Sequence, residues 1–142
     1  AYLHDWGAFE TYRQPGVDHP LRSRQVAESQ VLPQTSLTPG QVERVLEAIE
    51  LHDYRSAGLS RFAETSLLRQ ADCLDLLGTI GLARELAWGP NDLPKVAARI
   101  RGRWEAMRAC LTLPRARQMG EERILEMEEF FRRLEQQSYG WL

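Results

Sequence analysis

Residues 67–78 read LLRQADCLDLLG, and this stretch does most to decide the fold class. Its apolar residues recur three and four positions apart, which is the spacing of an α-helix. A helix this apolar should be largely buried, so Asp72 and Asp75, one turn apart, should be paired, hydrogen-bonded or bound to a cation. We expect the helix to span 64–87, and the sequence leaves open a break at either glycine in that range.

Helical patterns continue on the N-terminal side of this stretch. One helix is expected over 21–32. Another begins at Pro39 with Thr38 as its N-cap, because a threonine hydroxyl accepts hydrogen bonds from free amides and proline suits the first helical position. The inward stripe of this second helix contains Val42, Val45, Leu46, Ile49 and His52. Residues 5–20 and 53–63 are expected to be irregular.

Two more helices are expected on the C-terminal side. The first is capped by Asn91 and ended by Pro114, and the second follows it to the end of the chain. The apolar stripe of the second helix consists of Ile124, Met127, Phe131 and Leu134. Because no segment alternates as a strand would, the sequence predicts an all-α fold, with residues 1–142 forming a single domain.

Composition excludes several classes of function. The chain has 43% hydrophobic and 27% charged residues and a net charge of −2, so it has no basic footprint for a nucleic acid polymer. No apolar run is long enough to span a membrane, and no signal peptide is visible, so a membrane partner is not expected. The two cysteines, Cys73 and Cys110, do not indicate a disulfide framework, which makes a cytoplasmic location the expectation.

Two histidine positions are candidates for chemistry. His4 and Asp5 are adjacent at a place that reads as the end of a helix, where neighbouring side chains can converge on one ligand. His52 lies on an apolar stripe and should therefore be hydrogen-bonded or coordinated. The alternatives are a pair of surface polar residues for His4 and Asp5, and a satisfied core histidine for His52.

The inward carboxylates strengthen the interpretation as a cation site. Asp72 and Asp75 are expected to face inward, like the histidines, and few basic residues are close enough to pair with them. This combination favours a bound cation. Neutralisation by Arg69 and Arg84 is the structural alternative.

The order and spacing of these residues resemble the HD superfamily of metal-dependent phosphohydrolases. Residues 3–9, LHDWGAF, look like its His-Asp signature, and residues 64–75 resemble the segment that supplies its last metal aspartate. The continuation to Arg84 is similar to small bacterial HD hydrolases of the nucleotide pyrophosphohydrolase type. Asp18-His19, Ser23, the helix of His52 and the final arginine-rich helix also fit that pattern, so the resemblance covers the whole chain.

The resemblance implies an HD-type helical bundle that lacks its first helix in this chain. It also implies that His4, Asp5 and Asp72 are metal ligands. The family's other usual ligand is a histidine on a preceding helix, and no histidine precedes His4 in this sequence; we expect that ligand in a segment before Ala1. Gln70 and Cys73 depart from the pattern, standing where an aspartate and a basic residue are usual.

The implied chemistry is hydrolysis of a small phosphorylated substrate, and a nucleotide is the substrate that the resemblance suggests. A mixed imidazole and carboxylate site suits Mn²⁺, Fe²⁺, Co²⁺ or Ni²⁺ better than Mg²⁺. Such a metal activates water for attack on phosphorus, and arginines offset the growing charge.

The remaining candidates have several roles open to them. His19 and His52 are candidates for acid–base catalysis or for a second metal. Asp75 and Arg84 are candidates for orienting a ligand or contacting phosphate; Arg22, Arg24 and Arg55 are further phosphate candidates.

Two further matters stay open. The main alternative to an enzyme is a degenerate HD-like domain used for ligand sensing or protein interaction. Trp141 and Leu142 are a candidate partner-facing patch, and a homodimer is the assembly under consideration, although the sequence leaves the oligomeric state open.

Overall fold

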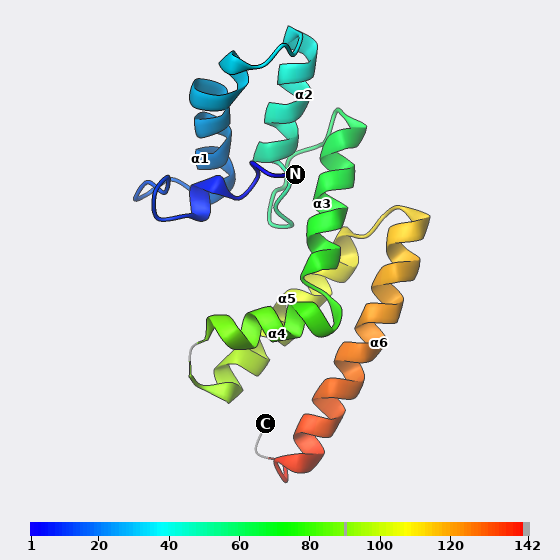
Figure 1. Ribbon diagram of the computed structural model, residues 1–142. Coiled ribbons are helices and arrows are strands. Elements are labelled where there is room, and N and C mark those ends of the chain that lie inside the picture. The colour runs from blue at the N-terminus through cyan, green and yellow to red at the C-terminus, as the bar shows by residue number, and fades with distance from the viewer. Residues whose placement is uncertain (90, 141–142) are drawn as a thin grey trace. The chain divides into compact units, whose positions relative to one another are not determined.

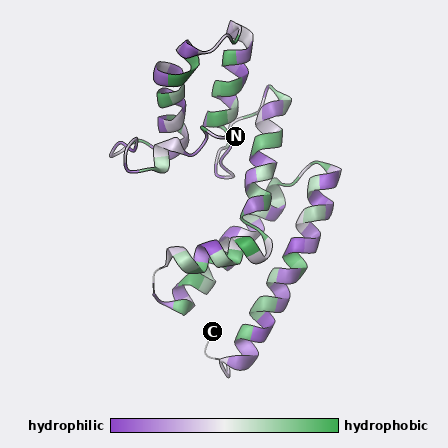
Figure 2. Cartoon of the chain, in the orientation of Figure 1, coloured by the Kyte–Doolittle hydropathy of each residue, from purple (hydrophilic) through white to green (hydrophobic). Residues whose placement is uncertain are grey.

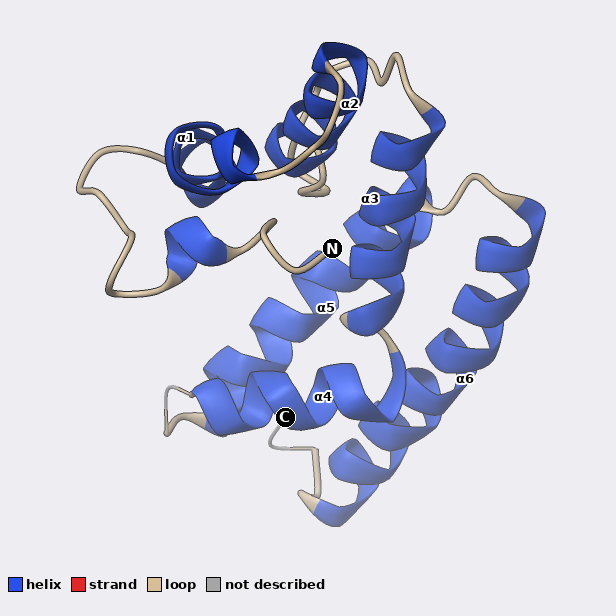
Figure 3. Cartoon of the chain, turned by 45° about the horizontal axis from the view of Figure 1, so that its top comes forward, coloured by secondary structure: helices blue, strands red, loops and turns tan. Residues whose placement is uncertain are grey.

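The computed structural model describes residues 1–89 and 91–140, and within these ranges it contains helices, turns and loops but no strand (Figure 3). The predicted all-α class is therefore confirmed. The chain divides into two compact units, Ala1–Arg69 and Gln70–Leu142, and the boundary falls within one helix (Figure 1). That the whole chain forms a single HD-type domain stays a prediction.

The first unit starts with a turn and a short 3-10 helix, η1 (Trp6–Ala8). The sequence indicated a helix end at residues 1–5, but the backbone bonds there join residues three apart: His4 N donates to the Ala1 carbonyl at 3.4 Å. That pattern is a turn, because an α-helix requires bonds between residues four apart. The predicted helix at 21–32 begins earlier than expected, as α1 (His19–Val26), and continues as short helical turns to Gln34.

The helix α2 (Pro39–Glu50) packs against α1 in the first unit. Its start follows the prediction, because Thr38 and Gln41 form a reciprocal capping box and Pro39 occupies the first turn. The core between these elements consists of Ala27, Leu32, Leu46 and Ile49, with Leu3, Val42 and Val45 packed against it. His52 lies just beyond the helix rather than on it, but it is only 1% exposed, as its inward position predicted.

The predicted 64–87 helix is broken into α3 (Ala63–Asp75) and α4 (Gly78–Trp88). Gly78 has a φ of +77°, which allows the chain to turn sharply between them. The expected burial of α3 is wrong in part: Leu67 is exposed, Asp72 is half-buried, and Asp75 is exposed. Asp75 forms an ion pair with Arg84 at the surface, so its charge is balanced without burial.

The second unit contains α4, α5 (Leu93–Cys110) and α6 (Pro114–Gln137). Hydrophilic and hydrophobic residues are interleaved along these helices (Figure 2). The buried hydrophobic residues of this unit include Leu82, Val96, Ala97, Ile100, Met107, Ile124, Met127 and Phe131. The cap of α5 is Asp92 rather than Asn91, because the Asp92 carboxylate accepts the amide of Lys95 at 3.1 Å. Pro114 opens α6 rather than ending α5, since a proline needs no amide partner in a first turn.

Gln70, one of the two positions that differ from the resemblance, has a structural role at the start of α6. Its Oε1 accepts hydrogen bonds from the amides of Thr112 at 2.9 Å and Leu113 at 2.8 Å, where α6 begins. Its Nε2 donates to the Thr112 hydroxyl at 3.0 Å. An aspartate is one methylene shorter and has no amide group to donate, so it would not reproduce this contact.

Three further expectations concern membrane-spanning helices, the two cysteines and a partner-facing patch. Over the described residues, none of the helices combines the length and apolar character that crossing a membrane requires. Cys73 is buried and Cys110 is partly buried, and the expectation that they belong to no disulfide framework stays a prediction. Trp141 and Leu142, the predicted partner-facing patch, lie outside the described residues.

Candidate metal centre

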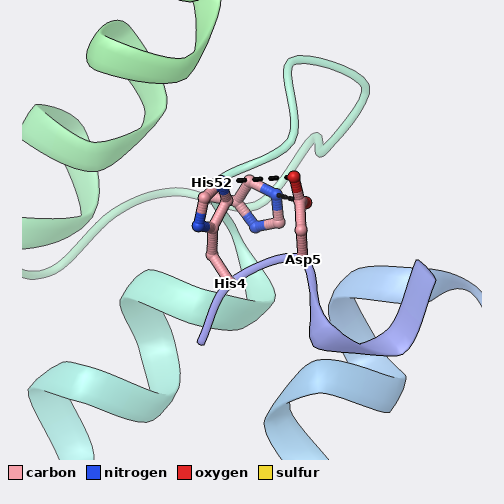
Figure 4. A group of neighbouring side chains, drawn as sticks. All are labelled: His4, Asp5 and His52. Carbon is pink, nitrogen blue, oxygen red and sulfur yellow. Dashed lines mark ion pairs between the residues drawn. The ribbon is translucent and has the colours of Figure 1, made fainter. Parts of the chain in front are cut away.

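Two histidines of the first unit, His4 and His52, converge on the carboxylate of Asp5 (Figure 4). His4 and Asp5 lie in the N-terminal turn, and His52 lies where the chain leaves α2. One ligand atom from each residue falls within 4.8 Å of the other two. A metal about 2.1 Å from each donor needs donors roughly 3–4 Å apart, so the group suits one divalent ion after small adjustments.

The tautomer of His52 is fixed by a buried hydrogen bond. Its Nδ1 lies 2.7 Å from the carbonyl oxygen of Ile49. A carbonyl only accepts, so Nδ1 carries a proton and Nε2 is the atom left for coordination. That Nε2 lies 3.3 Å from Asp5 Oδ1.

His4 repeats this arrangement at the other carboxylate oxygen of Asp5. Its Nδ1 contacts the carbonyl oxygen of Ala1, and its Nε2 lies 3.4 Å from Asp5 Oδ2. The rings of His4 and His52 meet edge to face with centroids 4.7 Å apart. Both histidines therefore use Nδ1 for a backbone carbonyl and direct Nε2 toward the same carboxylate.

Asp5 is ionised at neutral pH. Its pKa lies below the usual value, chiefly because of its hydrogen bond with His52; burial acts in the opposite direction, and the nearby histidines lower the pKa further. A neutral Nε2 would present its lone pair to this negative charge. A metal ion between the groups would accept both lone pairs and offset the charge of the carboxylate.

His19 extends the cluster, as the sequence suggested. It begins α1, and its Nε2 lies 3.6 Å from Asp5 Oδ1 and 3.6 Å from Asp53 Oδ2. Its ring lies 5.6 Å from that of His52, centroid to centroid. The predicted histidines His4, His19 and His52 are thus all within reach of Asp5.

Asp53 was missed by the sequence interpretation. It is a buried carboxylate directly after His52, in a segment that read as an irregular loop. The signal that could have revealed it is its place beside an inward histidine. Burial raises the pKa of Asp53, but hydrogen bonds from Arg55 outweigh this effect and leave the pKa below its usual value.

Three arginines of the first unit are candidates for binding phosphate: Arg22, Arg24 and Arg55. Of these, Arg55 contacts a histidine of the cluster. It binds Asp53 through Nε at 2.9 Å and a terminal nitrogen at 2.7 Å, and that nitrogen lies 3.5 Å from His19 Nδ1. The Asp53 contact raises the pKa of Arg55 above its already high value. The side chain is half exposed, so it borders both the cluster and the solvent.

The other two candidate arginines of this unit are engaged elsewhere. Arg22 donates to the carbonyl of Tyr12 at 2.5 Å, and Arg24 pairs with Glu50 at 2.6 Å. Arg55, which also binds a carboxylate, is therefore the best placed of the three for an anion at the cluster because it alone of them contacts His19.

Asp72, Asp75 and Arg84 belong to the second unit. Asp75 and Arg84 pair with each other, which is the structural alternative that the sequence left open for Arg84. Arg69, the other arginine considered for that role, instead donates to the Leu51 carbonyl at 2.6 and 2.8 Å. The roles of Asp72 as a metal ligand and of Asp75 and Arg84 near the substrate stay predictions.

Comparisons with protein-family models, with curated proteins and with solved structures found no match for this chain.

Proposed function

We propose that this protein is a metal-dependent phosphohydrolase acting on a small phosphorylated substrate, with a nucleotide as the substrate to test first. The observation that carries the proposal is the convergence of two Nδ1-anchored histidines, His4 and His52, on the carboxylate of Asp5. Histidine ligands whose other nitrogen is held by a backbone carbonyl are the usual arrangement at metal sites in proteins.

The donor set suits a transition metal. Two imidazole nitrogens and a carboxylate favour Mn²⁺, Fe²⁺, Co²⁺ or Ni²⁺, whereas Mg²⁺ prefers oxygen donors. His4, Asp5 and His52 would hold the ion, and Asp72 is the additional ligand that the sequence resemblance suggests. When bound, such an ion supplies Lewis acidity toward water and toward a phosphoryl oxygen.

Two residues beside this site fit roles in phosphate chemistry. Arg55 presents a guanidinium at the edge of the cluster, where it can bind and orient a phosphoryl group and offset its charge. His19 lies between two carboxylates, Asp5 and Asp53, so it can hold or release a proton beside the reacting group.

The first prediction concerns metal content. Protein purified without chelator should carry about one equivalent or more of a divalent transition metal, measured by elemental analysis, because one ion can accept the lone pairs of both imidazoles and the carboxylate at once. After chelation, hydrolysis of nucleoside triphosphates should stop and should return with Mn²⁺ or Co²⁺. A folded protein that binds neither ion would overturn the proposal.

The second prediction concerns Arg55. Arg55→Ala should lower kcat/KM for a hydrolysed nucleotide about 100-fold and weaken inhibition by inorganic phosphate, because it removes the cation that faces the phosphoryl group. Metal content should stay unchanged, since Arg55 donates hydrogen bonds and is not a ligand.

Arg44→Ala is the matched control for this experiment. Arg44 is also about half exposed and also forms an ion pair, with Glu64 at 3.1 Å, but it has no contact with the histidine cluster. Equal losses in Arg55→Ala and Arg44→Ala would reject a phosphate role for Arg55.

A non-catalytic sensing or interaction module is the second candidate. It is favoured by Gln70, whose amide is committed to the start of α6 where the HD pattern has a carboxylate. Metal-loaded protein that binds nucleotides without hydrolysing them, across a panel of nucleotides and phosphate esters, would support this alternative over the enzyme.

A further inference from the structure

The turn that carries Asp5 packs closely against the N-terminal half of α1. Gly7, two residues after Asp5, is buried, and η1 packs on α1. A Cβ at Gly7 would come within 2.7 Å of the Ser23 nitrogen and closer still to the His19 carbonyl oxygen. These are backbone atoms that cannot move aside, so only glycine allows so close an approach.

A single buried hydrogen bond joins the same two elements. The Gly7 amide donates to Ser23 Oγ at 2.8 Å, across sixteen positions of sequence. Ser23 is 0% exposed, so water cannot replace it as the acceptor. Ser23 itself lies outside the cluster: it is one helical turn beyond His19, on the same helix.

From these contacts we infer that Gly7 and Ser23 form a clamp that sets the position of Asp5 relative to His19. The clamp fixes the Asp5 turn on one side and the start of α1 on the other. Asp5 and His19 extend from these two elements and meet at 3.6 Å. Ser23 is thus a positioning residue, which acts through the backbone of Gly7 without touching the ligand atoms.

The effect of this clamp on metal binding rests on the proposed function. Asp5 contacts all three histidines of the cluster, so a displaced turn would disturb every donor pair at once. Residues that orient metal ligands from outside the coordination sphere change metal affinity about 10- to 100-fold when they are removed. Without the clamp, we expect the metal affinity to fall by a factor in this range.

Ser23→Ala is the direct test. In metal-free protein, the Gly7 amide should exchange with solvent at least about 10-fold faster than in the parent, and the ring resonances of His19 should shift, because the amide has lost its acceptor. In a metal titration with Co²⁺, the Kd should rise about 10- to 100-fold. Gly7→Ala should have the same effects, caused by the clash rather than by a lost acceptor.

Two controls separate positioning from a general loss of stability. Ser29→Ala removes an exposed serine hydroxyl that bonds only within its own segment, to the Gln25 carbonyl at 2.7 Å, and should leave the Kd unchanged. In a His19→Ala background, Ser23→Ala should raise the Kd for Co²⁺ by a smaller factor than in the parent, since part of its effect passes through His19.

The possible results lead to different conclusions. Unchanged Gly7 exchange and unchanged His19 resonances in Ser23→Ala would overturn the clamp, whether or not metal binds. Equal increases in Kd for Ser23→Ala with and without His19 would also overturn it. A parent protein that binds no Co²⁺ but shows the expected exchange and resonance changes would reject the metal function while leaving the clamp standing.

Discussion

Asp5→Asn should remove bound metal and lower turnover of a nucleotide substrate by about 1,000-fold or more. Asp5 is the carboxylate on which His4, His19 and His52 converge, and an amide in its place carries no charge and coordinates metal weakly. Lewis-acid assistance amounts to several kcal/mol of transition-state stabilisation, which corresponds to a rate loss of this size. Elemental analysis and steady-state kinetics on the full chain would measure the two effects.

The matched control for this variant is Glu10→Gln. It removes the same charge from an exposed position in the loop that follows Asp5, so it should change neither metal content nor turnover. Asp72→Ala, assayed in parallel, tests whether the ligand set extends to the residue that the HD resemblance indicates. Metal content and turnover that survive Asp5→Asn would reject the site; survival in Asp72→Ala would reject only the role of Asp72.

Much of the fold could be predicted because it depends on local patterns. Helical spacing marked the all-α class, and a threonine followed by proline located the start of α2 at Thr38 and Pro39. The break between α3 and α4 falls beside Gly78, one of the two glycines considered. His52 was correctly expected to be inward, since its spacing from Ile49 continues the apolar stripe.

The remaining features depend on contacts between distant segments. The carboxylate of Asp53 and the hydroxyl of Ser23 gain their importance from His19 and Gly7, and no spacing rule connects these pairs. The burial of α3 was overestimated because periodicity shows which residues share a face but does not show what covers that face. Asp75 illustrates this error: it sits in an apolar run, yet it pairs with Arg84 in solvent.

The sharp connection between α3 and α4 makes Gly81 the position where a single methyl group should be most harmful to the second unit. A Cβ on Gly81 would collide with the carbonyl group of Leu76 and lie 3.1 Å from its Cα. Leu76 is held in place from both sides, since its amide bonds to the Asp72 carbonyl at 3.3 Å and Leu77 beside it is 1% exposed. The collision is with backbone, so relief requires moving α4 away from the end of α3.

Gly81→Ala should therefore lower the free energy of unfolding by about 3 kcal/mol, at the upper end of overpacking costs. Gly102→Ala is the matched control, because Gly102 is also inside a helix, in α5, but a Cβ there would meet no atom within 4 Å. Alanine has the higher helix propensity, so this control should gain up to about 1 kcal/mol. Urea unfolding of the full chain, followed by circular dichroism, would measure both changes. If Gly81→Ala raises stability as Gly102→Ala is expected to do, helix propensity rather than the contact with Leu76 governs Gly81, and the close approach of α4 to Leu76 is wrong.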